Sequence, residues 1–138
     1  MSRRLVTWEE LSWQQVEEIV AELFAGLGYT VDLHRQAKDG GVDIVVIRKN
    51  DIFKPDELLV QIKHWRQPVG IDVVKLLHGE VVRRSSTRGI VATTSRFTRD
   101  AKEFLDTYRW QIEGKDRDDL LDWTKKYMAR KPTRAWLK

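Results

Sequence analysis

The apolar residues of the chain follow helical and strand-like periods in turn. They first recur at steps of three and four over residues 8–27, which predicts an amphipathic helix. Thr7 and Glu10 form a capping-box pattern at the start of this helix, and Gly28 is well placed to end it. The first predicted element is therefore a helix with one apolar face.

Shorter patterns predict three strands after this helix. Residues 29–33 alternate weakly, and residues 42–47 contain an unbroken Ile-Val-Val-Ile run that is typical of a strand covered on both faces. The turn signal Asp39-Gly40-Gly41 precedes the second strand. A polar loop over 48–57 then leads into a third strand over 58–65.

The remaining patterns alternate between helices and strands. Helical spacing predicts helices over 71–82, 98–107 and 116–129, and short apolar runs predict strands over 89–94 and 110–112. The predicted order is α-β-β-β-α-β-α-β-α. This order indicates an α/β fold in which a mixed sheet of about five strands is flanked by helices.

Length and composition indicate one globular domain. The chain has 138 residues, of which 41% are hydrophobic and 33% charged, and no Pro-, Gly- or Ser-rich linker divides it. We expect a single domain over 1–138, with a core at about 8–113 and a C-terminal helix and basic tail at 115–138. No apolar run approaches the roughly 18 residues of a membrane span, and no signal-peptide pattern is found. These features predict a soluble, cytoplasmic protein.

Positive charge is segregated along the chain. Lys and Arg total 25 against 21 Asp and Glu, which gives a net charge of +4. Residues 81–99 and 123–138 carry basic side chains and no acid. Clustered positive charge suits a polyanion such as nucleic acid, because each neutralised phosphate releases counterions. A solvated basic surface without a partner has the same pattern.

Several familiar kinds of site are excluded. The chain has no cysteine, which excludes disulfides, zinc held by cysteine, iron–sulfur clusters and thiol catalysis. It has no P-loop or dinucleotide-binding glycine motif, so we expect no nucleotide cofactor. The nucleophile elbow of hydrolases and the HExxH zinc motif are also missing.

Polar residues near the ends of the predicted strands are the candidate catalytic groups. Asp43 opens a strand, whereas Gln61 and Lys63 lie two apart on another strand and face the same side, which Trp65 shares. A carboxylate holds a hard divalent cation through oxygen, and such a cation activates water. An ammonium group orients the nucleophile or stabilises the transition state. The set suits phosphodiester hydrolysis, although each residue alone also fits a turn or an edge strand.

Four segments resemble the Mrr-type catalytic domain of the PD-(D/E)xK nuclease superfamily. They are Gly40-Gly41-Val42-Asp43, Leu59–Lys63, Val91–Thr98 with Ala101, and Val16-Glu17 followed by Leu23, Gly28 and Tyr29. The resemblance covers about residues 12–113. It implies a restriction-endonuclease-like three-layer sandwich.

The resemblance also implies a role for each matching position. Asp43 is the metal-binding aspartate, Lys63 the catalytic lysine and Glu17 an accessory glutamate. Gln61 stands where most of the superfamily has a second acid. Because glutamine is neutral, the cation would be held by Asp43, Glu17, Gln61 and the backbone carbonyl of Ile62. The implied cofactor is Mg2+, which Mn2+ could replace.

The implied function is a Mg2+-dependent endonuclease that cuts double-stranded DNA. We expect a homodimer, because cutting both strands requires two active sites. The residues expected to contact DNA are Arg66, His64, Ser95, Arg96, Arg83 and Arg84. A helix cap is the alternative role for Ser95. Two alternative functions remain: a structure-specific nuclease resembling Holliday-junction resolvases, and a non-catalytic DNA-binding module on the same fold.

Overall fold

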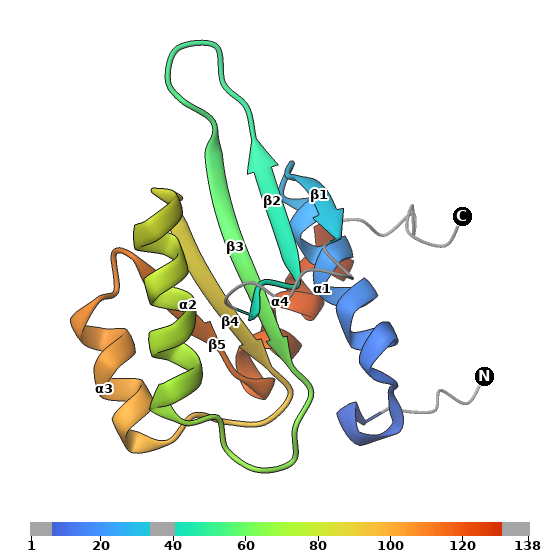
Figure 1. Ribbon diagram of the computed structural model, residues 1–138. Coiled ribbons are helices and arrows are strands. Elements are labelled where there is room, and N and C mark those ends of the chain that lie inside the picture. Colours follow the sequence, from blue (N-terminus) through green and yellow to red (C-terminus); the bar gives the residue numbers. More distant parts are fainter. Residues whose placement is uncertain (1–6, 34–40, 131–138) are drawn as a thin grey trace.

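Five strands form one mixed sheet in the part of the chain that the computed structural model describes, residues 7–33 and 41–130. The strands are β1 (Thr30–Leu33), β2 (Ile44–Arg48), β3 (Asp56–Lys63), β4 (Arg88–Thr93) and β5 (Ile112–Lys115). They lie in the order β1-β2-β3-β4-β5; β1, β2 and β3 pair antiparallel, whereas β3, β4 and β5 pair parallel. The β2–β3 hairpin projects beyond the helices (Figure 1).

Helices cover both faces of this sheet (Figure 1). They are a short 3-10 turn η1 (Trp8–Glu10), α1 (Trp13–Gly26), α2 (Ile71–Arg84), α3 (Arg99–Thr107) and α4 (Arg117–Arg130). Leu58, Val60 and Ile62 of β3 share one core with α1 and α4, whereas Leu59 shares the other core with α2 and α3. The predicted three-layer α/β sandwich is confirmed, and both faces of the central strands are covered as expected.

The first helix begins later than predicted. Ser12 is its N-cap: the Ser12 hydroxyl accepts a hydrogen bond from the Gln15 N–H at 3.1 Å, and the Gln15 side chain accepts one from the Ser12 N–H at 2.8 Å. Thr7 precedes the separate turn η1 and makes no capping hydrogen bond with its side chain. The predicted end is correct, because Gly28 follows the helix with φ at +94°.

Most other boundaries lie within two residues of the prediction, and β5 is the exception. Residues 108–111 form the turn that closes α3, where the Gln111 N–H donates to the Tyr108 carbonyl at 2.8 Å. The last strand therefore starts at Ile112, where the prediction ended it. Thr98 caps α3 as expected, since its hydroxyl accepts from the Ala101 N–H at 3.2 Å.

The loops that follow β3 and β4 lie side by side at one end of the sheet. The Val69 N–H donates to the Arg96 carbonyl at 2.7 Å, and the Thr98 N–H donates to the Val69 carbonyl at 2.9 Å. Strand β2 also starts at this end, opposite Val60 of β3. We call this end, with loops 64–70 and 94–98, the site end.

Some sequence predictions fall outside the described residues. These are the turn residues Asp39 and Gly40 and the basic tail over 131–138. Within the described ranges, every helix is too short or too polar to cross a lipid bilayer.

Candidate active site

Asp43 lies immediately before β2 and is held against the backbone of β3. Its Oδ2 accepts a hydrogen bond from the Ile62 N–H at 2.7 Å, and its own N–H donates to the Val60 carbonyl at 2.8 Å. The paired register of β2 and β3 ends with Ile44 opposite Val60, so Asp43 lies just beyond the last pair, toward the site end. Asp43 therefore bonds to the backbone of Val60 and Ile62, the two residues that flank Gln61.

Lys63, the last residue of β3, joins this pair. It lies two residues after Gln61 and so faces the same side of the sheet. Its Nζ is 5.0 Å from the centroid of the Trp65 ring, within the range of a cation–π interaction. The charge of Lys63 also acts on Asp43, where it favours the ionised carboxylate. The carboxylate and the amine of the sequence prediction therefore both lie at the site end, where the charge of one acts on the other.

The charge of Asp43 is incompletely compensated within the described residues. Burial raises the pKa of Asp43 above its ordinary value of 3.8. The Ile62 N–H and the Lys63 charge act in the opposite direction, and burial is the largest effect. A partly buried carboxylate of this kind gains from a cation, since a bound cation supplies the missing positive charge.

Gln61 presents an unsatisfied oxygen at the same place. Its side chain is 3% exposed, and Oε1 has no hydrogen-bond partner in the described part of the protein. A buried acceptor left without a partner costs about 1–3 kcal/mol. Such an atom in a native structure calls for an explanation, and a ligand position is one.

The oxygen atoms at this point fit a hard divalent cation. Asp43 offers a carboxylate and Gln61 a carboxamide oxygen, and the Ile62 carbonyl points to the same strand edge as the Ile62 N–H that Asp43 binds. Mg2+ takes oxygen ligands, commonly one or two carboxylates together with water and substrate phosphate. Among residues 7–33 and 41–130, His, Asp and Glu side chains form no ready-made cluster of three. A cation here therefore depends on amide and main-chain oxygen as well.

His64 ties the start of α1 to the site end. Its Nε2–H donates to the Leu11 carbonyl at 2.7 Å, and its Nδ1 lies within hydrogen-bond distance of the Thr94 hydroxyl, at 2.7 Å. Both ring nitrogens are therefore used inside the protein. The structure thus gives His64 a structural role in joining α1 to the loop after β4.

Glu17 lies on α1, in the other helical layer. It is fully buried, six residues after Leu11, whose carbonyl binds His64. Its neighbour Val16 packs in the core on the face of the sheet opposite to Gln61. Glu17 therefore belongs to the helical layer on the α1 side of the sheet, whereas Gln61 and Lys63 face the α2 side.

Ser95 is also engaged inside the protein. It is 4% exposed, and its hydroxyl donates to the Arg66 carbonyl at 3.1 Å. Its carbonyl accepts from the Arg117 N–H at 3.0 Å, at the start of α4. Ser95 thus holds the loops together and neither caps α3 nor offers its hydroxyl at the surface for the predicted DNA contact.

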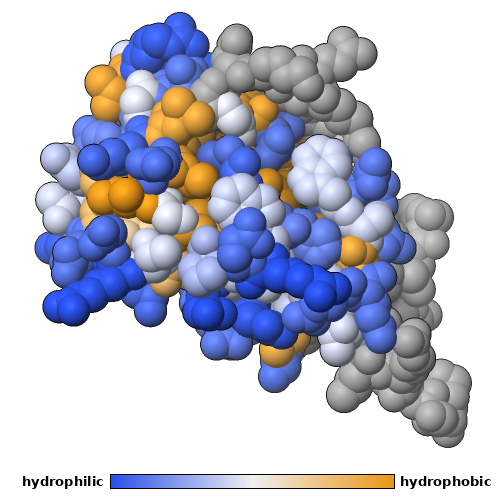
Figure 2. All heavy atoms as spheres, turned by 60° about the horizontal axis from the view of Figure 1, so that its bottom comes forward, coloured by the Kyte–Doolittle hydropathy of each residue, from blue (hydrophilic) through white to orange (hydrophobic). Residues whose placement is uncertain are grey.

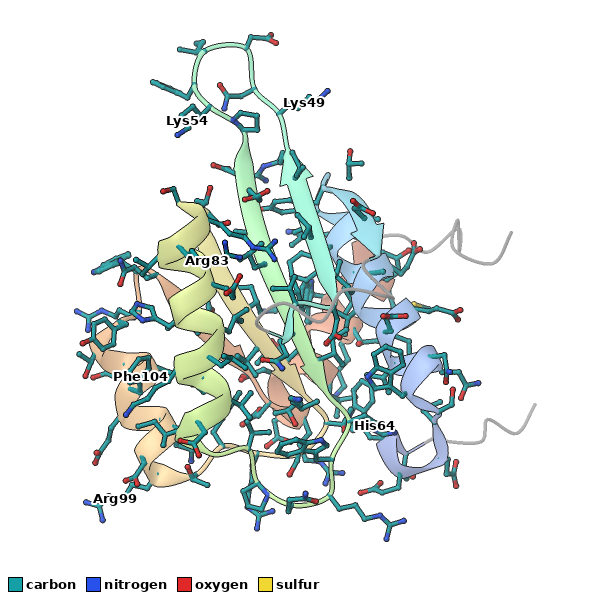
Figure 3. The ribbon with its side chains drawn as sticks, viewed as in Figure 1. Lys49, Lys54, His64, Arg83, Arg99 and Phe104 are labelled. Carbon is teal, nitrogen blue, oxygen red and sulfur yellow. The ribbon has the colours of Figure 1, made fainter. Side chains whose placement is uncertain are left out.

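The arginines predicted to bind DNA lie in two separate places. Arg66 and Arg96 are exposed in the two loops of the site end. Arg83 and Arg84 lie at the C-terminal end of α2, and Figure 3 shows Arg83 well away from His64 at the site end. Both bind the Glu80 carboxylate, at 2.7 Å and 3.1 Å. Of these four arginines, Arg66 and Arg96 are therefore the two that lie at the same end of the sheet as Lys63.

The surface at the site end suits a polar ligand. Hydrophilic residues dominate the lower part of the face that comes forward in Figure 2. A small cavity of about 80 Å³ beside Lys63 is lined by two tryptophans and by polar residues: Trp8, Glu9, His64, Trp65, Arg66 and Thr94. A cavity of about 510 Å³ lies elsewhere, between α3 and β5, and contains none of the candidate catalytic groups. Of these two cavities, the smaller one adjoins the site end.

Comparison with known proteins identifies the family. A family model described as a restriction endonuclease, the Mrr catalytic domain, matches residues 8–124. The chain belongs to the Mrr-type restriction endonuclease family. The resemblance seen in the sequence is thereby confirmed, and the match spans every strand of the sheet.

Two relatives show how this Mrr-type domain occurs in longer proteins. The type IV methyl-directed restriction enzyme EcoKMrr of Escherichia coli (strain K12) is 32% identical over 108 residues, which are 75% of this chain and 35% of that protein. The uncharacterized protein y4cE of Sinorhizobium fredii (strain NBRC 101917 / NGR234) is 34% identical over 126 residues, 89% of this chain and 32% of that protein. The chain thus spans about a third of the length of these relatives.

Solved structures show the same fold. The DNA modification-dependent restriction endonuclease AspBHI has a TM-score of 0.63 and 20% identity, covering 99% of this chain and 43% of that one. The MspJI restriction endonuclease in complex with a 27-mer oligonucleotide has a TM-score of 0.61 and 21% identity, covering 83% of this chain and 27% of that one. The Mrr-type chain therefore has the fold of restriction endonucleases.

Proposed function

We propose that this domain is a Mg2+-dependent endonuclease that hydrolyses phosphodiester bonds of double-stranded DNA. The observation that carries the proposal is that Asp43, bound to Ile62, lies at the site end with the unsatisfied oxygen of Gln61 and with Lys63, whose charge acts on Asp43. Membership in the restriction endonuclease family supports it. So does the oligonucleotide bound to the structurally similar MspJI.

Four groups hold the cation in this proposal. They are the carboxylates of Asp43 and Glu17, the Gln61 carboxamide and the Ile62 carbonyl. A bound divalent cation lowers the pKa of its water and offsets negative charge on the phosphate. Glu17 is included because a fully buried glutamate is uncommon, and because a second carboxylate supplies charge that Gln61 lacks.

Lys63 acts on the reacting phosphate. Its ammonium lies close enough for its charge to act on Asp43, and there it orients the attacking water and stabilises the negative charge that develops on the phosphate. The Trp65 ring, 5.0 Å away, restricts where this ammonium can lie. A domain of this kind carries one such site, so we propose that a homodimer cuts both strands.

The activity itself is the first test. Purified protein is expected to convert supercoiled plasmid to nicked or linear forms in Mg2+ or Mn2+, and EDTA is expected to stop the reaction. The same preparation is given a four-way junction and a linear duplex of the same sequence. Faster cleavage of the junction than of the duplex would support the structure-specific nuclease instead. DNA binding without cleavage in either metal would support the non-catalytic DNA-binding module.

Phosphate contacts are predicted for one arginine pair only. The double variant Arg66→Gln/Arg96→Gln is expected to weaken DNA binding and to reduce the slope of log K against log salt concentration by about 2, since each phosphate contact contributes about 0.9. The double variant Arg83→Gln/Arg84→Gln removes the same charge, yet it is expected to keep the wild-type slope because Glu80 already pairs with both arginines. Fluorescence anisotropy in Ca2+ over a salt series measures both slopes. Equal losses in the two variants would contradict the assignment.

A further inference from the structure

Gly41 lies directly against the side chain of Gln61. A Cβ atom placed on Gly41 would overlap Gln61 Nε2 and would lie 2.9 Å from Cδ and 3.2 Å from Oε1. Gly41 also has φ at +74°, in the left-handed region that favours glycine. The position thus excludes other residues for two reasons, the backbone conformation and the contact with Gln61.

Gly28 shares the backbone conformation of Gly41 but not its close contact. It has φ at +94°, but a Cβ there would meet nothing within 4 Å. Glycine is therefore favoured at Gly28 by its backbone conformation alone. At Gly41 the missing side chain also makes room for a buried carboxamide.

The contact has a chemical consequence because a carboxamide has two different ends. The Nε2 end of Gln61 is the one nearest to the site that a Gly41 side chain would occupy, and Oε1 is the end without a hydrogen-bond partner in the described residues. A glutamate would offer oxygen in either orientation. A glutamine helps to bind a cation only when its oxygen faces the cation, because its NH2 group is a donor.

One short segment therefore fixes two oxygen ligands. Gly41 packs on Gln61, and Asp43, two residues later, accepts the hydrogen bond from Ile62 on the same strand. We propose that Gly41 is a positioning residue of the metal site, which turns the Gln61 carboxamide so that its oxygen faces the cation beside Asp43. This inference rests on the proposed metal-dependent function and adds to it the residue that orients the neutral ligand.

The test is a double-mutant cycle that measures metal binding without DNA. Isothermal titration with Mn2+ is performed on wild type, Gly41→Ala, Gln61→Ala and the double variant, with Gly28→Ala as the control for backbone strain. Gly41→Ala is expected to weaken Mn2+ binding about tenfold, at the low end for residues that orient metal ligands. Gly28→Ala is expected to bind as wild type does. In the Gln61→Ala background, Gly41→Ala is expected to cause little further loss of Mn2+ affinity, because the Gln61 carboxamide that Gly41 positions is absent.

Three results would overturn the inference while leaving the nuclease proposal in place. They are unchanged Mn2+ affinity in Gly41→Ala, equal losses in Gly41→Ala and Gly28→Ala, and full additivity with Gln61→Ala. A further outcome of this experiment is that Gly41→Ala itself fails to fold. In that case, a double variant that folds supports the contact between Gly41 and Gln61. A double variant that also fails to fold, while Gly28→Ala folds, contradicts the contact. A wild-type protein that binds no Mn2+ and cleaves no DNA would instead contradict the proposed function.

Discussion

Replacement of Lys63 by methionine is expected to slow DNA cleavage by about 100- to 1,000-fold, the usual cost of one charge-stabilising group in an active site. Methionine keeps an unbranched apolar stem that can pack beside Trp65, but it removes the ammonium. The fold is therefore expected to persist. Single-turnover cleavage of plasmid at saturating Mg2+ measures the loss.

The control for Lys63→Met is Lys54→Met. Lys54 lies near the tip of the β2–β3 hairpin, at the end of β3 far from His64 (Figure 3). This variant carries the same chemical change and is expected to cleave at the wild-type rate. If Lys63→Met cleaved within a few-fold of wild type, or if both variants lost activity equally, the catalytic role of Lys63 would be wrong.

Replacement of Asp43 by asparagine is expected to change activity and stability in opposite directions. Cleavage falls by at least about 100-fold, because a neutral amide replaces a carboxylate ligand of the cation. The melting temperature in EDTA at pH 8 rises, because the variant has no charge to bury. Asparagine Oδ1 can still accept the hydrogen bond from the Ile62 N–H, so the local geometry is kept.

The pH dependence of this stability follows from the raised pKa of Asp43. Between the ordinary value of 3.8 and the raised value, the folded protein holds more protons than the unfolded chain. The free energy of unfolding contributed by Asp43 therefore falls as the pH rises through this window and stays low above it. The stability advantage of Asp43→Asn is accordingly expected to be full at pH 8 and to shrink as the pH falls through the window.

Differential scanning fluorimetry of both proteins from pH 8 to pH 4 measures this difference. Other carboxylates titrate in the same range, but they titrate in both proteins and largely cancel in the comparison. Mn2+ is expected to raise the melting temperature of wild type and not that of Asp43→Asn. An Asp43→Asn protein that is less stable than wild type at pH 8, or that cleaves as fast, would contradict this account.

Two equivalent local signals can compete, and the sequence alone does not decide between them. Thr7 with Glu10 and Ser12 with Gln15 both match the capping-box spacing. The second pair caps α1, and His64 binds the carbonyl of Leu11 immediately before it. A contact 53 residues away in sequence helps to fix where the chain enters this helix.

Charge patterns along the chain are similarly incomplete. The acid-free segment 81–99 indicates a basic surface, but Glu80 stands one residue before it. Because α2 is helical, Glu80 lies within reach of the arginines three and four residues later and neutralises part of their charge. The positions of Arg66 and Arg96 on adjoining loops, in contrast, follow from strand pairing that no local pattern contains.

The sequence by itself determined the order of helices and strands, the mixed sheet and the residue types available for catalysis. Hydrophobic periods are local, so each segment carries its own signal for helix or strand and for the face that it buries. Only the tertiary structure decided which groups meet. The Asp43 carboxylate binds an N–H 19 residues later, and Gly41 makes room for Gln61 from another strand. Such contacts depend on strand register and on packing of the folded chain, which arise only when distant segments come together.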